Sequence, residues 1–476
     1  MADFKGSKGD LFALPGGDVG IAFGVEQRHE TQQDDRDPHV NGAIPFFDAV
    51  TGLTQPSSAT GVNTTPSTKG SRDVSSAYLE FAVPLVSESM NVPLVKAINV
   101  QLAGRYEHYS DFGDVSKPKV ALAWDVIDSV RLRASWQKGF RAPNLETTAD
   151  YSYGRATSVT DYIRCEADIR AGRLTNFNAC ARGIGLRLFI AGNPDLGPET
   201  SESTNFGVVL MPTFLPDSFG SFVITADRWT LDQVGGVGVY GVNNQSILDY
   251  AARVQGGSNS DVVRAAPNAD DIALFAGTGI DPVGVIIDIH DRFQNLAPQQ
   301  LSGWDFGVTW NKDTDNAGEF GVNLNMTYMD KYEASALAGV DELFTARDDG
   351  IINAATPLDD GGNRLRDGGR PEYKGSANLT WSLRGLSFGV SGNYVGSVLD
   401  TGLLTNDGEP WRVDDSVLLN AYGQYKFKVG GLEGVKVRIG ARNVLDKMPP
   451  VSQTGYNGGL YQPYGRYLYG SVGISF

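Results

Sequence analysis

Long runs of apolar residues are missing from this chain of 476 residues. No stretch approaches the roughly 20 apolar residues that a membrane-spanning helix needs, and the mean hydropathy is −0.21. A helical membrane protein is therefore excluded. Strands that cross a membrane are not excluded, because only every second residue of such a strand faces lipid.

Positive charge is scarce relative to negative charge. The chain has 40 Lys and Arg residues against 56 Asp and Glu residues, which gives a net charge of −16 and an isoelectric point near 4.7. A nucleic-acid partner is disfavoured, because binding to a phosphate backbone requires clustered Lys and Arg. The acidic pairs lie in predicted loops without the alternating oxygen-ligand spacing of a calcium loop, and we interpret them as solvated surface.

Residues of common catalytic and metal sites are also scarce. The sequence has four His residues and contains no HExxH, G-x-S-x-G or P-loop motif. We therefore expect no catalytic, cofactor-binding or metal-ligating residue, no cofactor and no enzymatic activity. His108 lies near the rim of a predicted strand, where a hydrolase built on a membrane wall would carry a histidine, but a polar role on the wall is the simpler interpretation.

The chain has only two cysteines, Cys165 and Cys180. A lone pair in one polar segment favours a disulfide over a metal site, because a structural metal site uses four ligands. A disulfide indicates an oxidising compartment, and the loop that it closes would stabilise the fold by about 3 kcal/mol.

Alternation with period two is what the sequence has in abundance. The segment VRLRASWQ (130–137) sets Val, Leu, Ala and Trp against Arg, Arg, Ser and Gln, and VKVRIGARN (435–443) repeats the pattern. The 58 glycines suit an all-β chain with many turns. Because the second face of each strand carries Arg, Lys, Asn and Gln, it suits water rather than the core of a sandwich.

Such segments predict about 15 strands. They lie near 3–13, 18–33, 73–84, 97–111, 117–127, 130–140, 201–212, 219–231, 299–311, 318–332, 372–384, 386–399, 413–427, 435–446 and 464–476. Most run for about 10 to 15 residues, longer than the 5–6 typical of soluble strands and close to the tilted length that crosses a bilayer.

The predicted connections alternate between short and long. Short turns lie near 127–129, 311–319, 384–385 and 428–434, and long segments lie near 34–72, 141–200, 232–298 and 334–371. Outer-membrane barrels have this asymmetry, with short periplasmic turns and long extracellular loops. The sequence therefore predicts a transmembrane antiparallel β-barrel with long extracellular loops. One long segment also has helical spacing, at Ile247, Tyr250, Ala251 and Val254.

The two ends of the chain predict an incomplete barrel. The first residues, MADFKGSKGD, lack the apolar core of a secretory signal, so no signal peptide is expected. The predicted turns make the first strand and the last strand run in the same direction. An antiparallel barrel closes only with an even number of strands, so we expect the chain to be the C-terminal part of a larger barrel.

Four segments stand out in order along the chain: KGFRAPNLET (138–147), GNPDLGPETSES (192–203), ARNVLDK (441–447) and the final strand that ends in Phe476. Together they resemble the C-terminal barrel of TonB-dependent outer-membrane receptors, and the resemblance covers essentially the whole chain. The family-motif residues are Phe140, Arg141, Ala142, Pro143, Asn193, Pro194, Leu196, Pro198, Glu199, Asn443 and Asp446. For each we favour a role in barrel architecture over ligand contact, because prolines and Asn–Pro or Gly–Pro pairs end strands and form turns.

The resemblance implies a 22-stranded barrel whose lumen is filled by an N-terminal plug. Residues 1–476 would then form the C-terminal part of the receptor barrel, with about seven strands missing and with no plug domain, TonB box or signal peptide. TonB would act on the chain only through the missing plug. Phe476 resembles the terminal signal that the barrel-assembly machinery reads.

The resemblance also implies a multi-pass barrel in the outer membrane of a Gram-negative cell, in contact with lipid and lipopolysaccharide. The implied function is energised uptake of a large scarce ligand: siderophore-iron, vitamin B12 or an oligosaccharide. The long loops would capture that ligand, and the sequence does not select among these classes. The alternative is a passive porin-like or surface-structural barrel that acts without a plug.

Overall fold

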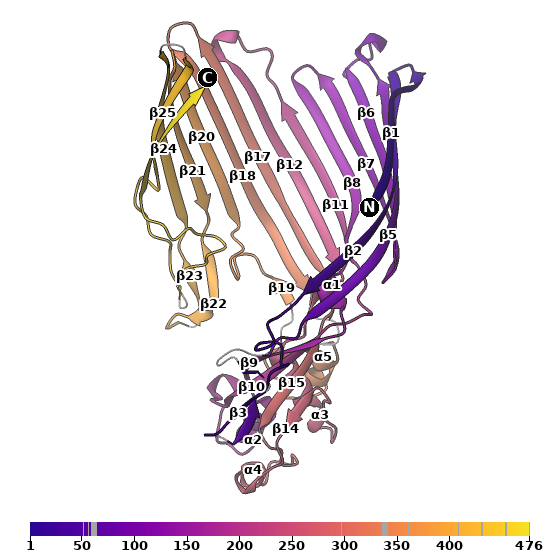
Figure 1. The fold of residues 1–476 in the computed structure, drawn as a ribbon, viewed down its shortest axis with the longest axis vertical. Coiled ribbons are helices and arrows are strands. Elements are labelled where there is room, and N and C mark those ends of the chain that lie inside the picture. Colours follow the sequence, from indigo (N-terminus) through magenta and orange to yellow (C-terminus); the bar gives the residue numbers. More distant parts are fainter. Residues whose placement is uncertain are drawn as a thin grey trace.

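A large curved sheet and a smaller lobe beyond one end of it make up the computed structural model (Figure 1). The structure describes residues 1–50, 52–55, 57–58, 64–296, 298–335, 341–358, 361–407, 409–429, 432–452 and 455–475. No helix among these residues is long and apolar enough to cross a membrane.

Within the described residues, fifteen strands form the large sheet in the order of the sequence, each antiparallel to the next. They are β1 (Ala2–Leu14), β2 (Gly17–Asp34), β5 (Thr68–Val86), β6 (Ala97–Tyr109), β7 (Gly113–Ile127), β8 (Val130–Arg141), β11 (Glu199–Leu210), β12 (Ser221–Val234), β17 (Gln299–Thr314), β18 (Gly318–Ser335), β20 (Tyr373–Leu383), β21 (Leu386–Val395), β24 (Ser416–Val429), β25 (Leu432–Arg442) and β26 (Tyr467–Ser475). The short strand β19 (Gly361–Asn363) pairs with the end of β18. The predicted number of wall strands is confirmed.

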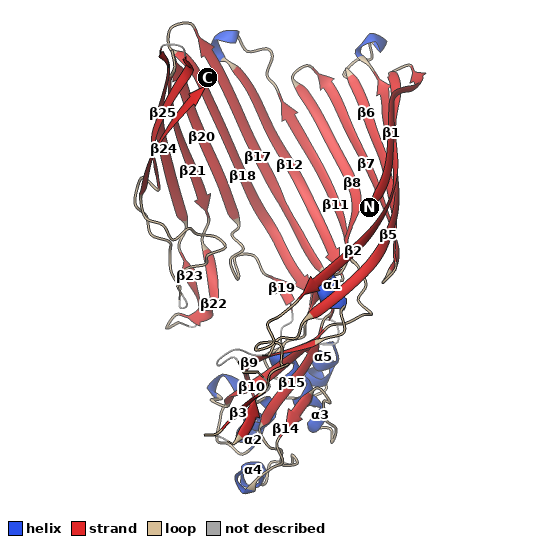
Figure 2. Ribbon diagram, in the orientation of Figure 1, coloured by secondary structure: helices blue, strands red, loops and turns tan. Residues whose placement is uncertain are grey.

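The sheet has two edges, β1 and β26. Figure 2 shows the curved row of strands with these ends apart. Both edge strands run in the same direction, because a row of fifteen alternating strands ends in the direction in which it began. An antiparallel barrel needs an even number of strands, so closing this wall takes an odd number of additional strands.

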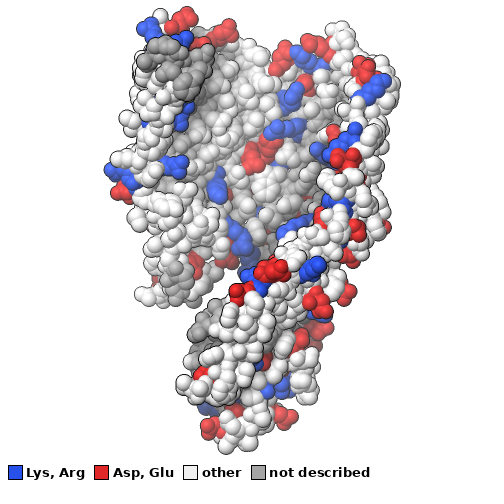
Figure 3. Space-filling view, in the orientation of Figure 1, with Lys and Arg blue, Asp and Glu red and all other residues white. Residues whose placement is uncertain are grey.

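The strand register gives the wall an apolar face and a polar face. Leu379 lies opposite Val390, and Leu102 lies opposite Val120, and all four side chains remain exposed. The concave face carries charged side chains of both signs (Figure 3). A wall with exposed apolar residues on one side and charges on the other is typical of barrels that have lipid outside and water inside.

Tryptophans fasten the short turns to the wall. The indole N–H of Trp310 donates to the carbonyl of Phe219 at 2.7 Å, and that of Trp381 donates to the carbonyl of Ala317 at 2.7 Å. Trp124 makes the same kind of bond, at 3.1 Å, to the β5–β6 connection. Tryptophan with its ring on an apolar face and its N–H satisfied at the edge is typical of a membrane interface.

A second row of aromatic residues lies toward the long connections. Tyr328 and Tyr373 stack with ring centroids 4.9 Å apart, and the guanidinium of Arg228 lies 5.7 Å from the ring centroid of Trp304. Tyr373 and Trp381 begin and nearly end β20, about 27 Å apart along the strand. For a tilted strand, this separation suits the apolar band of about 25 Å between the aromatic girdles of membrane barrels.

Connections at the two ends of the wall differ in length, as predicted. The short end includes η1 (Glu88–Met90) and η3 (Asp217–Phe219). On the other end, the β6–β7 connection is short. The long connections contain β3 (Phe46–Asp48), β4 (Leu53–Gln55), α1 (Leu145–Thr148), β9 (Ser152–Thr160), α2 (Tyr162–Arg170), η2 (Phe177–Ala179), β10 (Gly183–Ala191), β13 (Val237–Gly238), α3 (Val242–Arg253), β14 (Val262–Arg264), α4 (Ala269–Phe275), β15 (Ile286–Arg292), β16 (Gln294–Asn295), α5 (Asp341–Asp348), β22 (Val398–Leu404) and β23 (Pro410–Val413).

Three of these connections build the lobe, which we define as β9, β10, β14, β15 and α2–α5. Its sheet has the order β14-β15-β10-β9, in which β10 and β15 are parallel. Ile163 of α2 and Tyr250 of α3 are fully buried in one apolar core, which Leu343 of α5 completes. The predicted helix around Tyr250 is confirmed as α3.

Three predicted strand ends are wrong. The predicted strand 435–446 continues beyond β25, which ends at Arg442, because Asn443 and Asp446 adopt left-handed conformations. The predicted strands 386–399 and 413–427 extend beyond the wall strands β21 and β24. Between these strands, β22 and β23 form a hairpin that leaves the wall. Val398 and Val413 of the hairpin are buried together with Tyr461, so the apolar alternation at these positions serves a loop cluster rather than the wall.

Candidate functional site

The FRAP residues lie where β8 leaves the wall. The ring of Phe140 packs edge-on against Tyr109 with a centroid distance of 5.9 Å, and Ala142 joins the same apolar cluster. The carbonyl of Pro143 accepts a hydrogen bond of 2.8 Å from Arg72. These contacts anchor the end of β8 to β5 and β6.

The NPDLGPE segment returns the chain from the lobe to the wall. The amide of Asn193 donates to the carbonyl of Phe293 at 2.8 Å, and Leu196 is buried. The carboxylate of Glu199 accepts a backbone N–H of β13 at 2.9 Å and lies 3.7 Å from the guanidinium of Arg141. The structure thus brings the FRAP and NPDLGPE motifs together at one rim.

A residue that sequence reasoning missed clamps this rim. Pro194 and Pro198 bound the turn, and Gly197 between them donates its N–H to the side-chain oxygen of Asn295 at 2.9 Å. The amide of Asn295 donates back to the carbonyl of Gly197 at 3.0 Å and to that of Gly235 at 2.7 Å. No local pattern marks Asn295, because its partner is 98 residues away in sequence.

The two motif residues near the C-terminus shape the β25–β26 connection. Asn443 adopts a left-handed conformation with φ of 49°, and its amide donates to the carbonyls of Lys447 and Tyr464 at 2.8 and 3.1 Å. Asp446 is also left-handed, with φ of 54°, and accepts the N–H of Arg466 at 2.7 Å. Asn and Asp tolerate this conformation because their short side chains hydrogen-bond locally.

The assembly signal Phe476 lies outside the described residues, so that role stays a prediction. The motif contacts described above are contacts with the chain itself. A ligand-binding role is therefore better sought in the lobe, on the concave face and among the long connections.

The lobe is braced by a disulfide. Cys165 of α2 and Cys180, directly after η2, are joined, with their Cα atoms 5.8 Å apart. Cys165 is fully buried in the lobe core next to Tyr162. The bond holds α2 against the segment that leads into β10.

A buried ion cluster links the lobe elements. Arg264 donates to both carboxylate oxygens of Asp161 at 2.8 Å and to Asp249 at 2.7 Å, and none of the three side chains is more than 4% exposed. Burial lowers the pKa of Arg264, but the hydrogen bonds and negative charges of Asp161 and Asp249 together outweigh burial and raise that pKa above its ordinary value. Nearby, the backbone N–H of Asn268, together with Arg164, lowers the pKa of Asp271.

The concave face of the wall is polar and balanced in charge. Arg133 donates to both carboxylate oxygens of Asp227, at 2.7 and 2.5 Å, and Arg131 pairs with Asp125. The first pair borders a hollow of 490 Å³ on this face, which Asn325 also lines. Because these arginines are paired, they provide no unpaired basic patch for an anionic ligand.

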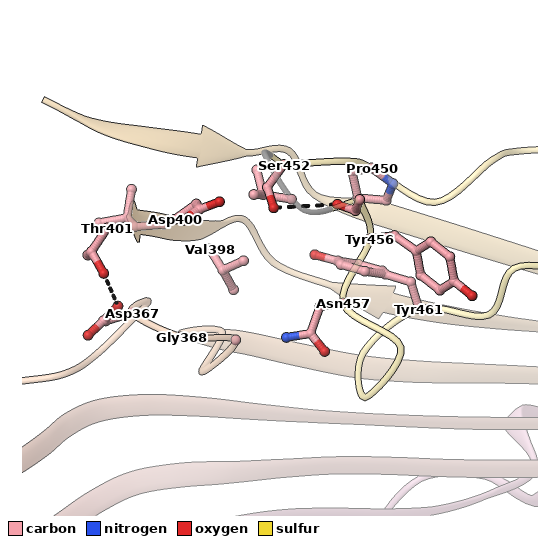
Figure 4. A pocket seen from close by; sticks show the side chains of 14 residues that line it. Asp367, Gly368, Val398, Asp400, Thr401, Pro450, Ser452, Tyr456, Asn457 and Tyr461 are labelled. Carbon is pink, nitrogen blue, oxygen red and sulfur yellow. Dashed lines mark hydrogen bonds between the residues drawn. The ribbon is translucent and has the colours of Figure 1, made fainter. Parts of the chain in front are cut away.

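A polar cavity of 280 Å³ lies among the β18–β20, β21–β24 and β25–β26 connections (Figure 4). Asp367, Asp400 and Thr401 line one side of it, and Asn457 and Tyr461 line another. The hydroxyl of Thr401 donates to Asp367 at 3.0 Å. Figure 4 shows the hydroxyl of Tyr461 directed toward the middle of the cavity.

Within the described residues, no group of three or more His, Cys, Asp or Glu side chains is suited to a metal ion. His108 lies 2.7 Å from the carboxylate of Asp114. Its cross-strand neighbour Ser75 donates its hydroxyl to Gln27 at 2.5 Å. The wall therefore satisfies these polar groups pairwise without aligning the serine with the imidazole.

A family model described as "TonB dependent receptor-like, beta-barrel" matches residues 3–444. The chain belongs to this family. TonB-dependent receptors are outer-membrane β-barrels that interact with TonB and with extracellular ligands. No curated protein sequence matches the chain.

Solved structures of TonB-dependent receptors share the fold. The siderophore receptor PirA from Acinetobacter baumannii is 17% identical, with a TM-score of 0.58, and the match covers 100% of this chain and 54% of that one. A mutant of the ferric enterobactin receptor PfeA from Pseudomonas aeruginosa is 16% identical, with a TM-score of 0.56 and coverage of 100% and 53%. The chain thus spans about half the length of these receptors, and at such identity the likeness shows the fold alone.

TonB-dependent barrels carry their long connections outside the cell and their short turns in the periplasm. The lobe, the clamped rim and the cavity of Figure 4 all belong to the long connections of this wall.

Proposed function

We propose that the chain forms the membrane wall and capture loops of an outer-membrane receptor for energised uptake of a large scarce ligand, without catalysis. The wall itself carries the proposal. It has fifteen antiparallel strands, an exposed apolar face, a charged concave face, and long connections concentrated at one end. Fold and family membership both favour a receptor over a soluble β-protein.

The lobe supports a role in ligand capture because its internal contacts make it rigid before a ligand binds. A disulfide, a buried ion cluster and a core shared by α2, α3 and α5 fix its surface. A surface ordered before binding loses less conformational entropy when a ligand arrives. Siderophore-iron, vitamin B12 and oligosaccharides are the ligand classes of the proposal.

Energy coupling in this proposal requires parts that join the wall between β1 and β26. A 22-stranded receptor barrel would add about seven strands there, and a plug would fill the lumen. Seven is an odd number, as the parallel directions of β1 and β26 require. TonB would act through the plug.

The test is ligand accumulation in cells that express the protein from its own locus, with and without TonB. Radiolabelled ferric siderophores, cyanocobalamin and oligosaccharides serve as the panel. We expect one class to accumulate only when TonB is present and to stop accumulating when the locus is deleted. Accumulation that ignores TonB, together with a steady single-channel conductance in planar bilayers, would instead establish the passive pore.

A further inference from the structure

The cavity of Figure 4 is bordered by a buried polar group, the hydroxyl of Tyr461. Tyr461 is only 4% exposed, and its hydroxyl has no hydrogen-bond partner among the residues that the structure describes. A buried hydroxyl without a partner has lost its hydrogen bonds to water without compensation, which destabilises a fold. The ring is held by the apolar cluster of Val398 and Val413, and the hydroxyl points into the cavity (Figure 4).

We propose that this cavity binds a neutral polyhydroxylated group, such as one sugar ring of a larger ligand, with the Tyr461 hydroxyl bonded to it. The identification of this group as part of the transported ligand rests on the proposed function. Binding of the group at the cavity does not depend on transport.

Unused acceptors in the cavity call for a ligand that donates hydrogen bonds. Asp367 accepts one hydrogen bond from Thr401 at 3.0 Å, and Asp400 accepts the backbone N–H of Gly402 at 3.1 Å. An ionised carboxylate has about four acceptor positions, so both retain capacity. Hydroxyl groups can donate to these carboxylates and also accept from Tyr461, which a ligand of acceptors alone cannot do.

The charge of the cavity selects against anions. Its described lining includes the carboxylates of Asp367 and Asp400 but no Lys or Arg. A carboxylate or phenolate ligand would meet like charge there. A cation is not required either, because the guanidinium of Arg364 lies 3.8 Å from Asp367 and offsets part of its charge.

The size and floor of the cavity fit one ring rather than a whole siderophore. Its volume of 280 Å³ falls just below the range of about 300–1,000 Å³ of most small-molecule sites. Val398 and Val413 offer an apolar floor for the C–H face of a ring. Three separate connections meet here, so the cavity exists before a ligand arrives.

Saturation-transfer NMR on the full chain folded in detergent micelles tests this site. The neutral probes are maltotriose, cellotriose, triacetylchitotriose and raffinose, and the charged probes are citrate and spermidine. We expect at least one trisaccharide to bind and Tyr461→Phe to weaken its affinity about tenfold, which is typical of one lost hydrogen bond. Because Tyr461→Phe keeps the ring and removes an unpaired hydroxyl, it should fold at least as stably as the parent.

Tyr456→Phe is the matched control. Tyr456 borders the same cavity but is 42% exposed, and its hydroxyl points away from the centre in Figure 4. This variant should keep the parent affinity. The proposal is wrong if no trisaccharide binds, if Tyr461→Phe leaves binding unchanged, or if citrate or spermidine binds in preference.

The two proposals fail separately. Trisaccharide binding at the cavity without any TonB-dependent accumulation would overturn the transport function and support the cavity. TonB-dependent accumulation of a ferric siderophore without trisaccharide binding would support the transport function and overturn the proposed role of the cavity.

Discussion

Arg264 lies between two carboxylates that have no contact with solvent, Asp161 and Asp249. The stability of the lobe depends on single side chains such as this one, because removing one member of a buried ion cluster leaves an uncompensated buried charge. The wall differs, since many of its ion pairs are partly exposed and individually contribute little.

Arg264→Met should destabilise the lobe by about 3–5 kcal/mol, because Asp161 and Asp249 would stay buried without a cation. Limited proteolysis across a urea series measures the lobe while the wall stays in detergent. Arg187→Met is the control: Arg187 also makes a bidentate pair, with Asp288, but its side chain is 65% exposed. An equal loss of lobe stability in both variants would contradict a special role for the buried cluster of Arg264.

The lobe should also lose stability in acid. Burial raises the pKa of Asp168, but the positive charges of Arg182 and Arg173 and their hydrogen bonds, at 2.5 and 2.6 Å, together outweigh burial and hold that pKa below its ordinary value of 3.8. A lowered folded pKa contributes stability above pH 3.8, and this contribution disappears as the pH falls through the folded pKa. The urea midpoint of the lobe should therefore be steady from about pH 7 to 5 and fall below about pH 4. Asp168→Asn should flatten that fall, and an unchanged slope would argue against this residue.

Among the elements, α2 depends most on a covalent tie. The Cys165–Cys180 bond closes a separation of 15 residues, and a loop of that length stabilises a fold by about 3 kcal/mol. The double variant Cys165→Ala with Cys180→Ala should lower the proteolytic unfolding temperature of the lobe. A reductant should lower it equally in the parent and have no effect on the double variant. If reductant also lowered the unfolding temperature of the double variant, its effect could not come from breaking the Cys165–Cys180 bond.

The turn of the NPDLGPE segment depends on a hydrogen-bonding clamp. Asn295→Ala removes one acceptor and two donors that reach Gly197 and Gly235. Hydrogen exchange of the Gly197 amide should accelerate about tenfold or more, in line with the loss of about 1–3 kcal/mol of local stability. Asn244→Ala, which loses a single bond to the carbonyl of Tyr240 just before α3, should leave that amide unchanged. If both variants lost protection of the Gly197 amide, the cause would be a general loss of structure in the lobe and rim rather than loss of the Asn295 clamp.

Sequence alternation predicted the wall strands because each strand repeats a pattern of period two, and the tight turns are local as well. The lobe sheet was not predicted, because its central parallel pair joins Arg187 to Asp288, far apart in sequence. Asn295 was missed for the same reason. Tyr461 was missed because the apolar residues around it resembled extensions of two wall strands.

For the whole molecule, the decisive feature is the pair of open edges. The outward amides of β1 and β26 have no strand partner among the described residues. In the isolated chain in detergent, these amides should exchange about 100-fold faster than those of β11 and β12, which are paired on both sides. Hydrogen-exchange mass spectrometry measures the difference. Equal protection at the edges would mean that two copies pair there.

The lobe draws on connections that leave the wall after β8, β12 and β18. Its disulfide lies within the first of these connections, whereas the β10–β15 pairing must wait for the second, and α5 arrives with the third. Contacts between such distant segments form late in folding. A lobe that resists protease therefore reports that all three connections, and the wall strands that flank them, have reached their places.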